Sequence, residues 1–136
     1  MTRVAHKLLE KAERSIAAGE SLVGPGHLEA AAGRAYYAMF YVAEALLAEQ
    51  GRRFRKHGGV HSAFGEYFVK TGAFDQKYHR WLLAAFNKRI TADYGVDAEL
   101  SEEEVRDMLV QSREFLLAAK QFLGDQPAGG EAPPQG

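Results

Sequence analysis

The sequence predicts an all-α protein, an up-down bundle of four to five helices. Apolar residues recur at spacings of three and four, as on an amphipathic helix, and do not alternate with polar residues as in a strand. Glycine and proline separate these apolar segments. With 136 residues, 46% of them hydrophobic, the chain has the size of a single domain. We expect that domain over residues 1–124 and a disordered, Pro- and Gly-rich tail over residues 125–136.

The first two predicted helices are separated by Gly-Pro-Gly at residues 24–26. The first covers residues 4–16, where apolar side chains at helical spacing alternate with lysine and arginine. The second ends near Gly51 and carries, beside its main apolar stripe, a second stripe formed by Tyr37, Phe40 and Tyr41. A helix that is apolar on two faces must be covered on both, either at the centre of a bundle or in a dimer contact.

A cationic loop and a short third helix are predicted next. Residues 52–59 read Arg-Arg-Phe-Arg-Lys-His-Gly-Gly, and the two glycines at the end indicate a loop. Val60 then begins a short apolar repeat that stops near Gly72.

Capping residues mark the last two predicted helices. Asp75 can cap a fourth helix that ends at Gly95. Ser101 followed three residues later by Glu104 is a capping box, which predicts the start of a fifth helix ending near Gly124.

Composition excludes several classes of protein. The charges nearly balance, with 17 Lys and Arg against 18 Asp and Glu, so any nucleic-acid site must be a local patch. The absence of cysteine excludes disulfides, thiolate zinc sites and cysteine nucleophiles. No window approaches the about 20 apolar residues of a membrane-spanning helix, and the N-terminus lacks the apolar stretch of a signal peptide. We therefore expect a cytoplasmic protein without a membrane partner.

Four segments together resemble the HEPN domain family, in particular its small stand-alone prokaryotic members. They are residues 33–47, GRAYYAMFYVAEALL; residues 56–72, KHGGVHSAFGEYFVKTG; residues 78–95, YHRWLLAAFNKRITADYG; and the final helix. The resemblance implies a helical bundle that is frequently a homodimer, without a cofactor. It also implies either a metal-independent RNase or a degenerate relative, and many small members are partnered with a minimal nucleotidyltransferase as a toxin and antitoxin pair.

Active members of that family carry an arginine followed four to six residues later by histidine. Arg89 matches the arginine, but the window after it holds Asp93, Tyr94 and Gly95. Arginine would stabilise charge on a phosphoryl group during attack by the ribose 2′-hydroxyl. Arg89 falls on the apolar face of its helix, one turn before Asp93, so the alternative is an ion pair that serves packing alone.

His57 is the best replacement for the missing histidine, because imidazole titrates near neutral pH and this one lies in a basic, glycine-flanked segment. The alternative is a histidine that caps a helix or packs on Phe54. Tyr94 is a poor general base at neutral pH, but its hydroxyl could accept a nucleotidyl group from a partner enzyme. The histidines at positions 61 and 79 are expected to be structural.

The remaining candidates are cationic residues that could bind RNA or a nucleotide. Arg34 and the tyrosine pair after it match the family motif and could line the same cleft as Arg89. Phe54 could stack on a base, while its basic neighbours would contact the phosphates. Those neighbours are Arg52, Arg53, Arg55 and Lys56. A solvated loop after a helix C-terminus would have the same composition, because the helix dipole favours cations there.

A metal site is not expected. The two close histidines, His57 and His61, would share a face only if the double glycine between them were helical. Three functions remain: a binder of RNA or nucleotide in a toxin–antitoxin-like system, with weak or lost catalysis; an active metal-independent endoribonuclease that uses Arg89 with His57 or Tyr94; and a dimeric interaction module without a nucleic-acid role.

Overall fold

The computed structural model describes residues 1–95 and 99–124, apart from the side chain of Tyr94. Five α-helices and one π-helical turn follow one another: α1 (Arg3–Val23), α2 (Leu28–Glu49), α3 (His57–Phe64), η1 (Gly65–Val69), α4 (Gln76–Tyr94) and α5 (Glu102–Gly124). No strand occurs within these residues. The predicted all-α bundle is therefore confirmed, while the predicted tail at residues 125–136 lies outside the described part.

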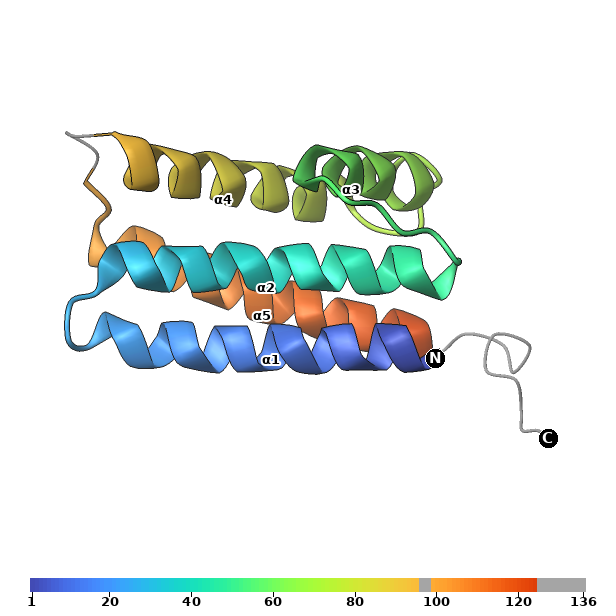
Figure 1. The fold of residues 1–136 in the computed structure, drawn as a ribbon, viewed down its shortest axis with the longest axis horizontal. Coiled ribbons are helices and arrows are strands. Elements are labelled where there is room, and N and C mark those ends of the chain that lie inside the picture. Colours follow the sequence, from blue (N-terminus) through green and yellow to red (C-terminus); the bar gives the residue numbers. More distant parts are fainter. Residues whose placement is uncertain (96–98, 125–136) are drawn as a thin grey trace.

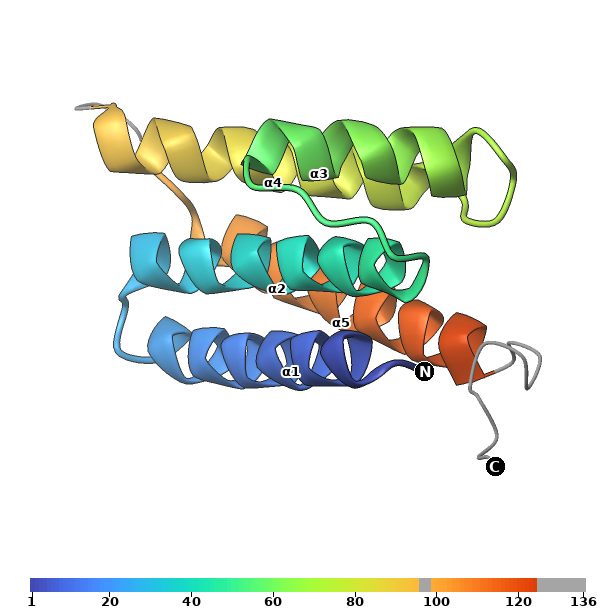
Figure 2. The ribbon, with the colours of Figure 1, turned by 45° about the vertical axis from the view of Figure 1, so that its right-hand side comes forward.

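The four long helices α1, α2, α4 and α5 run alternately up and down (Figure 1). Helix α2 lies in the middle, between α1 on one side and the pair α3 and α4 on the other, and α5 packs against both α1 and α2 (Figure 2). Most of the α2 side chains are buried as a result. The two apolar faces predicted for this helix are thus covered within one chain, in a central position.

Close packing of α1 against α2 depends on small residues. A Cβ atom added at Gly19 would lie 2.7 Å from the side chain of Leu109 and 3.3 Å from the carbonyl oxygen of Ala31. The buried Ser15 hydroxyl donates to the carbonyl oxygen of Arg34 over 2.7 Å. Helix α1 extends to Val23, beyond the predicted residues 4–16, because this contact continues along its second half.

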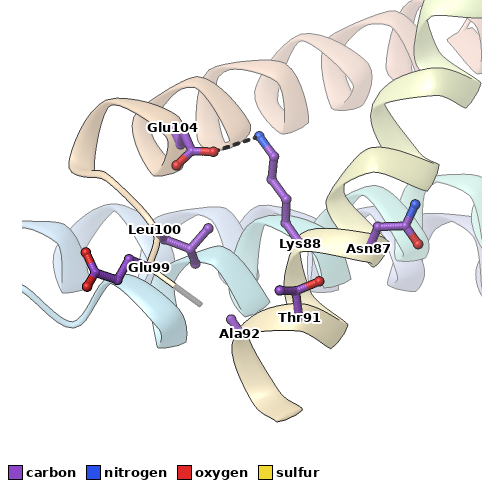
Figure 3. A pocket seen from close by; sticks show the side chains of 7 residues that line it. All are labelled: Asn87, Lys88, Thr91, Ala92, Glu99, Leu100 and Glu104. Atoms are coloured by element: carbon purple, nitrogen blue, oxygen red, sulfur yellow. Dashed lines mark ion pairs between the residues drawn. The ribbon is translucent and has the colours of Figure 1, made fainter. Parts of the chain in front are cut away.

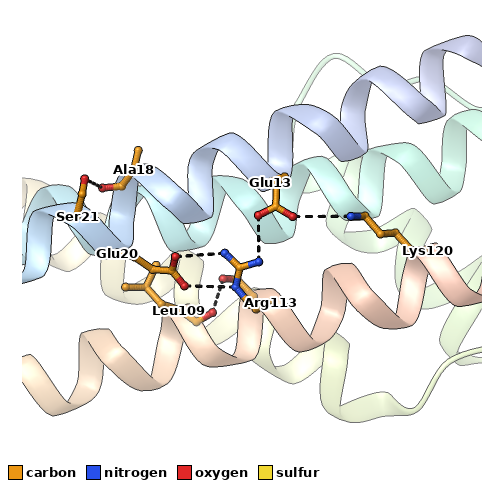
Figure 4. Close-up of polar contacts among 8 residues, drawn as sticks. Glu13, Ala18, Glu20, Ser21, Leu109, Arg113 and Lys120 are labelled. Atoms are coloured by element: carbon orange, nitrogen blue, oxygen red, sulfur yellow. Dashed lines mark hydrogen bonds and ion pairs between the residues drawn. The ribbon is translucent and has the colours of Figure 1, made fainter.

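A network of ion pairs joins α1 to α5 at the surface (Figure 4). The Arg113 guanidinium lies 3.0 Å from a carboxylate oxygen of Glu13 and 3.2 Å from one of Glu20. Lys120 adds a longer contact of 3.7 Å to Glu13. Because these side chains are partly exposed to solvent, each pair contributes about 0–1 kcal/mol.

The predicted helix caps are present. The Asp75 carboxylate accepts a hydrogen bond from the backbone N–H of Lys77 at 2.8 Å. At the start of α5, the Ser101 hydroxyl accepts from the N–H of Glu104 at 3.0 Å, and the Glu104 carboxylate accepts from the N–H of Ser101 at 3.1 Å. These two reciprocal bonds form the capping box that the sequence predicted.

Within the described residues, no helix combines the length and the apolar character needed to cross a membrane.

Candidate functional site

A cluster of aromatic and imidazole rings fills the space between α2, α3 and α4. Helix α2 contributes Tyr36 and Phe40, α3 contributes His57 and His61, and α4 contributes Phe86. We call these five residues the Tyr36 cluster. Where two of these rings are in contact, their centroids lie 4.3 to 6.3 Å apart. The cluster is therefore a continuous packed unit at the centre of this side of the bundle.

The Tyr36 hydroxyl is shared by the two histidines. It lies 2.8 Å from Nδ1 of His57 and 2.8 Å from Nε2 of His61. Burial raises the pKa of the Tyr36 phenol, and the charge of the neighbouring Tyr37 would raise it further, although Arg89 lowers it. The phenol therefore keeps its proton at neutral pH and can donate it to one of the two rings.

The double glycine is helical, contrary to the prediction of a loop over residues 52–59. Helix α3 begins at His57, so Gly58 and Gly59 form its first turn, and His57 and His61 share one face. Glycine is tolerated here because Gly59 packs closely on Phe54, where a Cβ would lie 3.3 Å from the Phe54 Cβ. The preceding residues 50–56 run back along α2, which brings His57 beside Tyr36 (Figure 1).

His57 is partly buried and stacks on Phe40, with ring centroids 4.3 Å apart. Burial lowers the pKa of His57, and the positive charge of Arg89 lowers it further. The imidazole is consequently neutral at pH 7. Phe40 lies beneath the His57 ring and is only 7% exposed. The middle residue of the second apolar stripe of α2, predicted for a bundle centre or a dimer contact, is therefore buried within one chain.

His61 is buried, as its predicted structural role requires. Burial, followed by the charges of His57 and His79, lowers the pKa of His61 to about 4. The His79 imidazole donates from Nε2 to the carbonyl oxygen of His61 over 3.1 Å. Gly65 permits this approach, because a Cβ there would lie 2.9 Å from the His79 ring.

Arg89 and Asp93 form the ion pair expected from their spacing, with Nε of Arg89 3.4 Å from a carboxylate oxygen of Asp93. The guanidinium also lies over the rings of Tyr37 and Tyr36, 5.1 and 5.9 Å from their centroids. Since this charge also affects His57, the structure brings Arg89 to the edge of the Tyr36 cluster. The side chains of Arg89 and Asp93 are 23% and 40% exposed, so the pair lies at the surface of that cluster.

Two residues of the basic loop are engaged with other side chains. The Arg52 guanidinium lies 3.6 Å from the centroid of the Tyr67 ring, and its Nε donates to Gln50 over 3.1 Å. Arg53 lies near the half-buried Glu44, whose pKa burial raises and the Arg53 charge lowers. Arg55 and Lys56 are exposed. The residues of the predicted basic patch therefore do not all face solvent in the same way. Among the described residues, only the side chains of Arg55 and Lys56 have no contact that holds them in place.

Arg34 lies elsewhere. Its Cβ faces α1, 3.1 Å from the position that a Cβ of Gly19 would take, and no described contact joins it to the Tyr36 cluster. Tyr94 is the last residue of α4, one turn after Ile90, and its side chain lies outside the described residues.

Sequence reasoning placed the tyrosine pair at residues 36 and 37 in the same cleft as Arg89, but it missed His61 and Phe86 as members of that site. The spacing of His57 and His61 was a usable signal, since residues four apart share a helix face. The double glycine between the two histidines favours a loop, in which they would share no face. The shared contact with Tyr36 depends on the packing of α3 on α2, which no local pattern reports.

A metal does not fit this arrangement. In the described part of the chain, no group of three or more histidine or acidic side chains converges as a set of ligands. A separate cavity of about 310 Å³ lies beyond the Tyr36 cluster, between the end of α4 and the start of α5 (Figure 3). Lys88 enters it but is paired there with Glu104, 3.5 Å away.

Comparison with known proteins identifies the family. The HEPN domain model matches residues 5–122. A protein of Methanocaldococcus jannaschii named "Putative toxin MJ0142" is 37% identical over 89% of this chain and 82% of its own length. A "UPF0332 protein" of Thermotoga maritima is 40% identical over 72% of this chain and 74% of its own. A relative from Gloeobacter violaceus, "UPF0332 protein glr0978", is 32% identical over 90% of this chain and 98% of its own length. The chain therefore belongs to the HEPN domain family.

Proposed function

We propose that this protein binds RNA or a nucleotide at the edge of the Tyr36 cluster, with Arg89 as the phosphate-binding residue. The observation that carries the proposal is the position of the Arg89 guanidinium, over the Tyr37 ring and beside the neutral His57. Its ion pair with Asp93 uses Nε, which leaves the two Nη groups for a phosphate. The Tyr37 ring, partly exposed, offers a surface on which a base can stack.

The electrostatics suit an anionic ligand. The Asp93 carboxylate balances the Arg89 charge, but it contacts the guanidinium through Nε at 3.4 Å and both side chains are partly exposed, so an anionic ligand can still bind the guanidinium. The net charge of the chain is −1, so attraction of RNA must be local rather than general. Arg55 and Lys56, which precede His57 in the chain, supply additional positive charge near the start of α3.

Binding of a labelled single-stranded RNA, followed by fluorescence anisotropy, tests the proposal. Arg89→Ala is expected to weaken binding by about 10- to 100-fold, because a hydrogen bond to a charged group contributes roughly 1.5–3 kcal/mol. Arg80→Ala, an exposed arginine on the same helix, is the matched control and should bind like the wild type. Equal affinities for the Arg89 variant and the wild type, both folded by circular dichroism, would refute the proposal.

Cleavage of RNA is a second candidate, and the position of His57 favours it. The charge of Arg89 acts on His57, and the lowered pKa of His57 keeps its imidazole unprotonated and able to accept a proton, so a base and a cation are in one site. His57 would take the proton from the 2′-hydroxyl as its oxygen bonds to phosphorus, and the bond from phosphorus to the 5′-oxygen would break, with that oxygen taking a proton from water. Incubation of RNA with EDTA present is the test: the wild type should cut, while His57→Ala and Arg89→Ala should not. Intact RNA with the wild type removes this candidate and leaves binding in place.

A toxin-like role is supported by the names of two relatives, "Putative toxin MJ0142" and "Putative toxin MJ0605" of Methanocaldococcus jannaschii. Within such a system, a minimal nucleotidyltransferase would be the partner, and Tyr94 its acceptor. The Tyr94 oxygen would attack the α-phosphorus of ATP, and pyrophosphate would leave. Intact mass after incubation with a candidate enzyme and ATP should show the added nucleotidyl group on the wild type but not on Tyr94→Phe. No mass gain on the wild type would exclude the modification.

Homodimerisation belongs to the same proposal, because the family is frequently dimeric. The partly buried Tyr41 ring, one turn from Tyr37, is its expected contact on α2. Light scattering after size exclusion would decide, since a monomer at all concentrations would exclude the dimer.

A further inference from the structure

Two partly exposed tyrosines of α2 each have a cation over their ring. The Arg89 guanidinium of α4 lies 5.1 Å from the centroid of the Tyr37 ring. The Lys11 ammonium of α1 lies 4.6 Å from the centroid of the Tyr41 ring. The two rings contact each other, with centroids 6.0 Å apart and planes inclined by 34°. Because α1 and α4 pack on opposite sides of α2, cation, ring, ring and cation follow one another across three helices (Figure 2).

Lys11 is open to solvent. Its side chain forms no ion pair or hydrogen bond with the described residues, and its contact there is with the face of the Tyr41 ring. Burial raises the pKa of the half-buried Glu44, and the charges of Arg53 and Lys11 lower it. Two cations therefore act on one carboxylate at this end of the tyrosine pair, and their positive charge is only partly balanced.

A lysine in this position has the chemistry of a phosphate-binding residue. The ring face attracts the ammonium and narrows the range of positions that it takes. The ammonium keeps its N–H groups for an oxygen acceptor, because the ring accepts no conventional hydrogen bond. Lys11 and Arg89 are thus two positioned cations, one from each side of α2, with the aromatic pair between them.

We propose that Lys11 binds a second phosphate group, so that the ligand is a single strand of RNA that crosses α2 from Arg89 to Lys11. The inference rests on the proposed function, in which Arg89 binds the first phosphate and the Tyr37 ring stacks on a base. A single strand has phosphates that repeat along its backbone and bases whose faces are free to stack. In a nucleoside triphosphate the phosphates adjoin one another, so they would meet one of the two cations.

The inference also links RNA binding to self-association. Tyr41 is the expected contact of the homodimer, and a second copy seated on this ring would cover Lys11. RNA and the second copy would therefore compete for the Tyr41 ring. The comparison between variants is accordingly made at a protein concentration whose oligomeric state has been measured by light scattering.

The salt dependence of binding reports the number of phosphates that the protein neutralises. A labelled oligouridylate of about 10 nucleotides, within the usual site size of single-strand binders, is titrated at several salt concentrations. Each phosphate contact to a single strand contributes about −0.7 to the slope of log affinity against log salt. Lys11→Ala should therefore make the slope less steep by about 0.7, and Arg89→Ala should do the same.

Lys70→Ala is the matched control, because it removes the same charge from an exposed position after η1 and should leave the slope unchanged. An unchanged slope in a folded Lys11→Ala variant would overturn the inference in either oligomeric state. If Arg89→Ala has no effect, the proposed function fails. A loss with Arg89→Ala but none with Lys11→Ala retains the proposed function and overturns only this inference.

Competition by unlabelled ATP separates a strand from a nucleotide. ATP should be bound through Arg89 alone, so its inhibition constant should be the same for the wild type and Lys11→Ala. An equal loss of affinity for ATP and for the oligouridylate in Lys11→Ala would identify a nucleoside triphosphate as the ligand and overturn the strand.

Two further variants test whether the Tyr41 ring positions Lys11. Tyr41→Phe keeps the ring face and should keep the salt slope of the wild type. Tyr41→Leu keeps an apolar contact but loses the ring face, so its slope should fall toward that of Lys11→Ala. A wild-type slope and affinity in Tyr41→Leu would overturn the positioning role of the ring.

Discussion

The two sides of α2 are packed in different ways. Toward α1 and α5, α2 presents small and aliphatic residues, and the helices approach closely at Gly19. Toward α3 and α4, the same helix presents Tyr36 and Phe40, which pack on imidazole rings. The first side contributes apolar burial and few polar groups, while the second holds three linked polar groups in its interior. A buried polar network stabilises the fold only when every member has a hydrogen-bond partner. Packing on the second side of α2 therefore depends on the exact positions of its polar groups, whereas packing on the first side depends mainly on apolar contact.

Truncation of the apolar side should have the largest effect on stability. Ile16 is fully buried, so Ile16→Ala is expected to lower the free energy of unfolding by about 2–5 kcal/mol. Chemical denaturation followed by circular dichroism measures this loss. The RNA affinity of the remaining folded protein should be unchanged, and a matched loss of affinity would show that the two sides of α2 are coupled.

Acid should act on the histidine side. The folded-state pKa of His61 is lowered from 6.5 to about 4, so between these values the unfolded chain binds the proton and the folded chain does not. Stability is therefore lost as the pH falls through this window, by up to about 1.4 kcal/mol per pH unit from this group. The lowered pKa of His57 acts in the same direction.

Urea unfolding at intervals from pH 7 to pH 4 checks this dependence. His61→Gln should flatten the slope, whereas His27→Gln, at an exposed position with no side-chain hydrogen bond, should preserve it. A slope as steep in the His61 variant as in the wild type would contradict the assignment.

A single polar contact on the apolar side should matter less. Ser15→Ala removes the hydrogen bond from the serine hydroxyl to the carbonyl oxygen of Arg34, which also accepts within α2. We expect a loss of about 0.5–1.5 kcal/mol in the free energy of unfolding, the typical contribution of one such bond. A loss as large as that of Ile16→Ala would mean that polar contacts also govern this side.

The smallest effect is expected at the surface of the same side. Arg113→Gln removes the ion pairs with Glu13 and Glu20, whose side chains are 42% and 49% exposed. The expected loss is below about 1 kcal/mol, and it should shrink further in high salt. If the loss of stability did not depend on salt, it would come from the packing of the aliphatic part of the Arg113 side chain and not from its charge.

Local signals in the sequence predicted most of the fold. The capping box at Ser101 and the Asp75 cap depend only on neighbours in the chain, and both are present. Arg89 and Asp93 are also neighbours on one helix, so their pairing could be read from spacing. By contrast, the glycines at 58 and 59 are helical because Phe54 and α2 support the turn, and helix propensity alone gave the wrong answer. The Tyr36 cluster joins three helices and could not be predicted from any one of them.

Two glycines enclose the segment that carries both histidines of the Tyr36 cluster. Gly51 and Gly72 adopt φ angles of +76° and +85°, which favour glycine, and α3 and η1 lie between them. This segment contacts α2 and α4, and its Phe64 and Phe68 rings also pack on Phe115 and Phe122 of α5, with centroids 5.3 and 6.0 Å apart. We expect it to be a separate unit of local unfolding, with amide protons that exchange sooner than those of α2. Local unfolding of this segment would separate His57 and His61 from Tyr36 while α1, α2 and α5 remain folded.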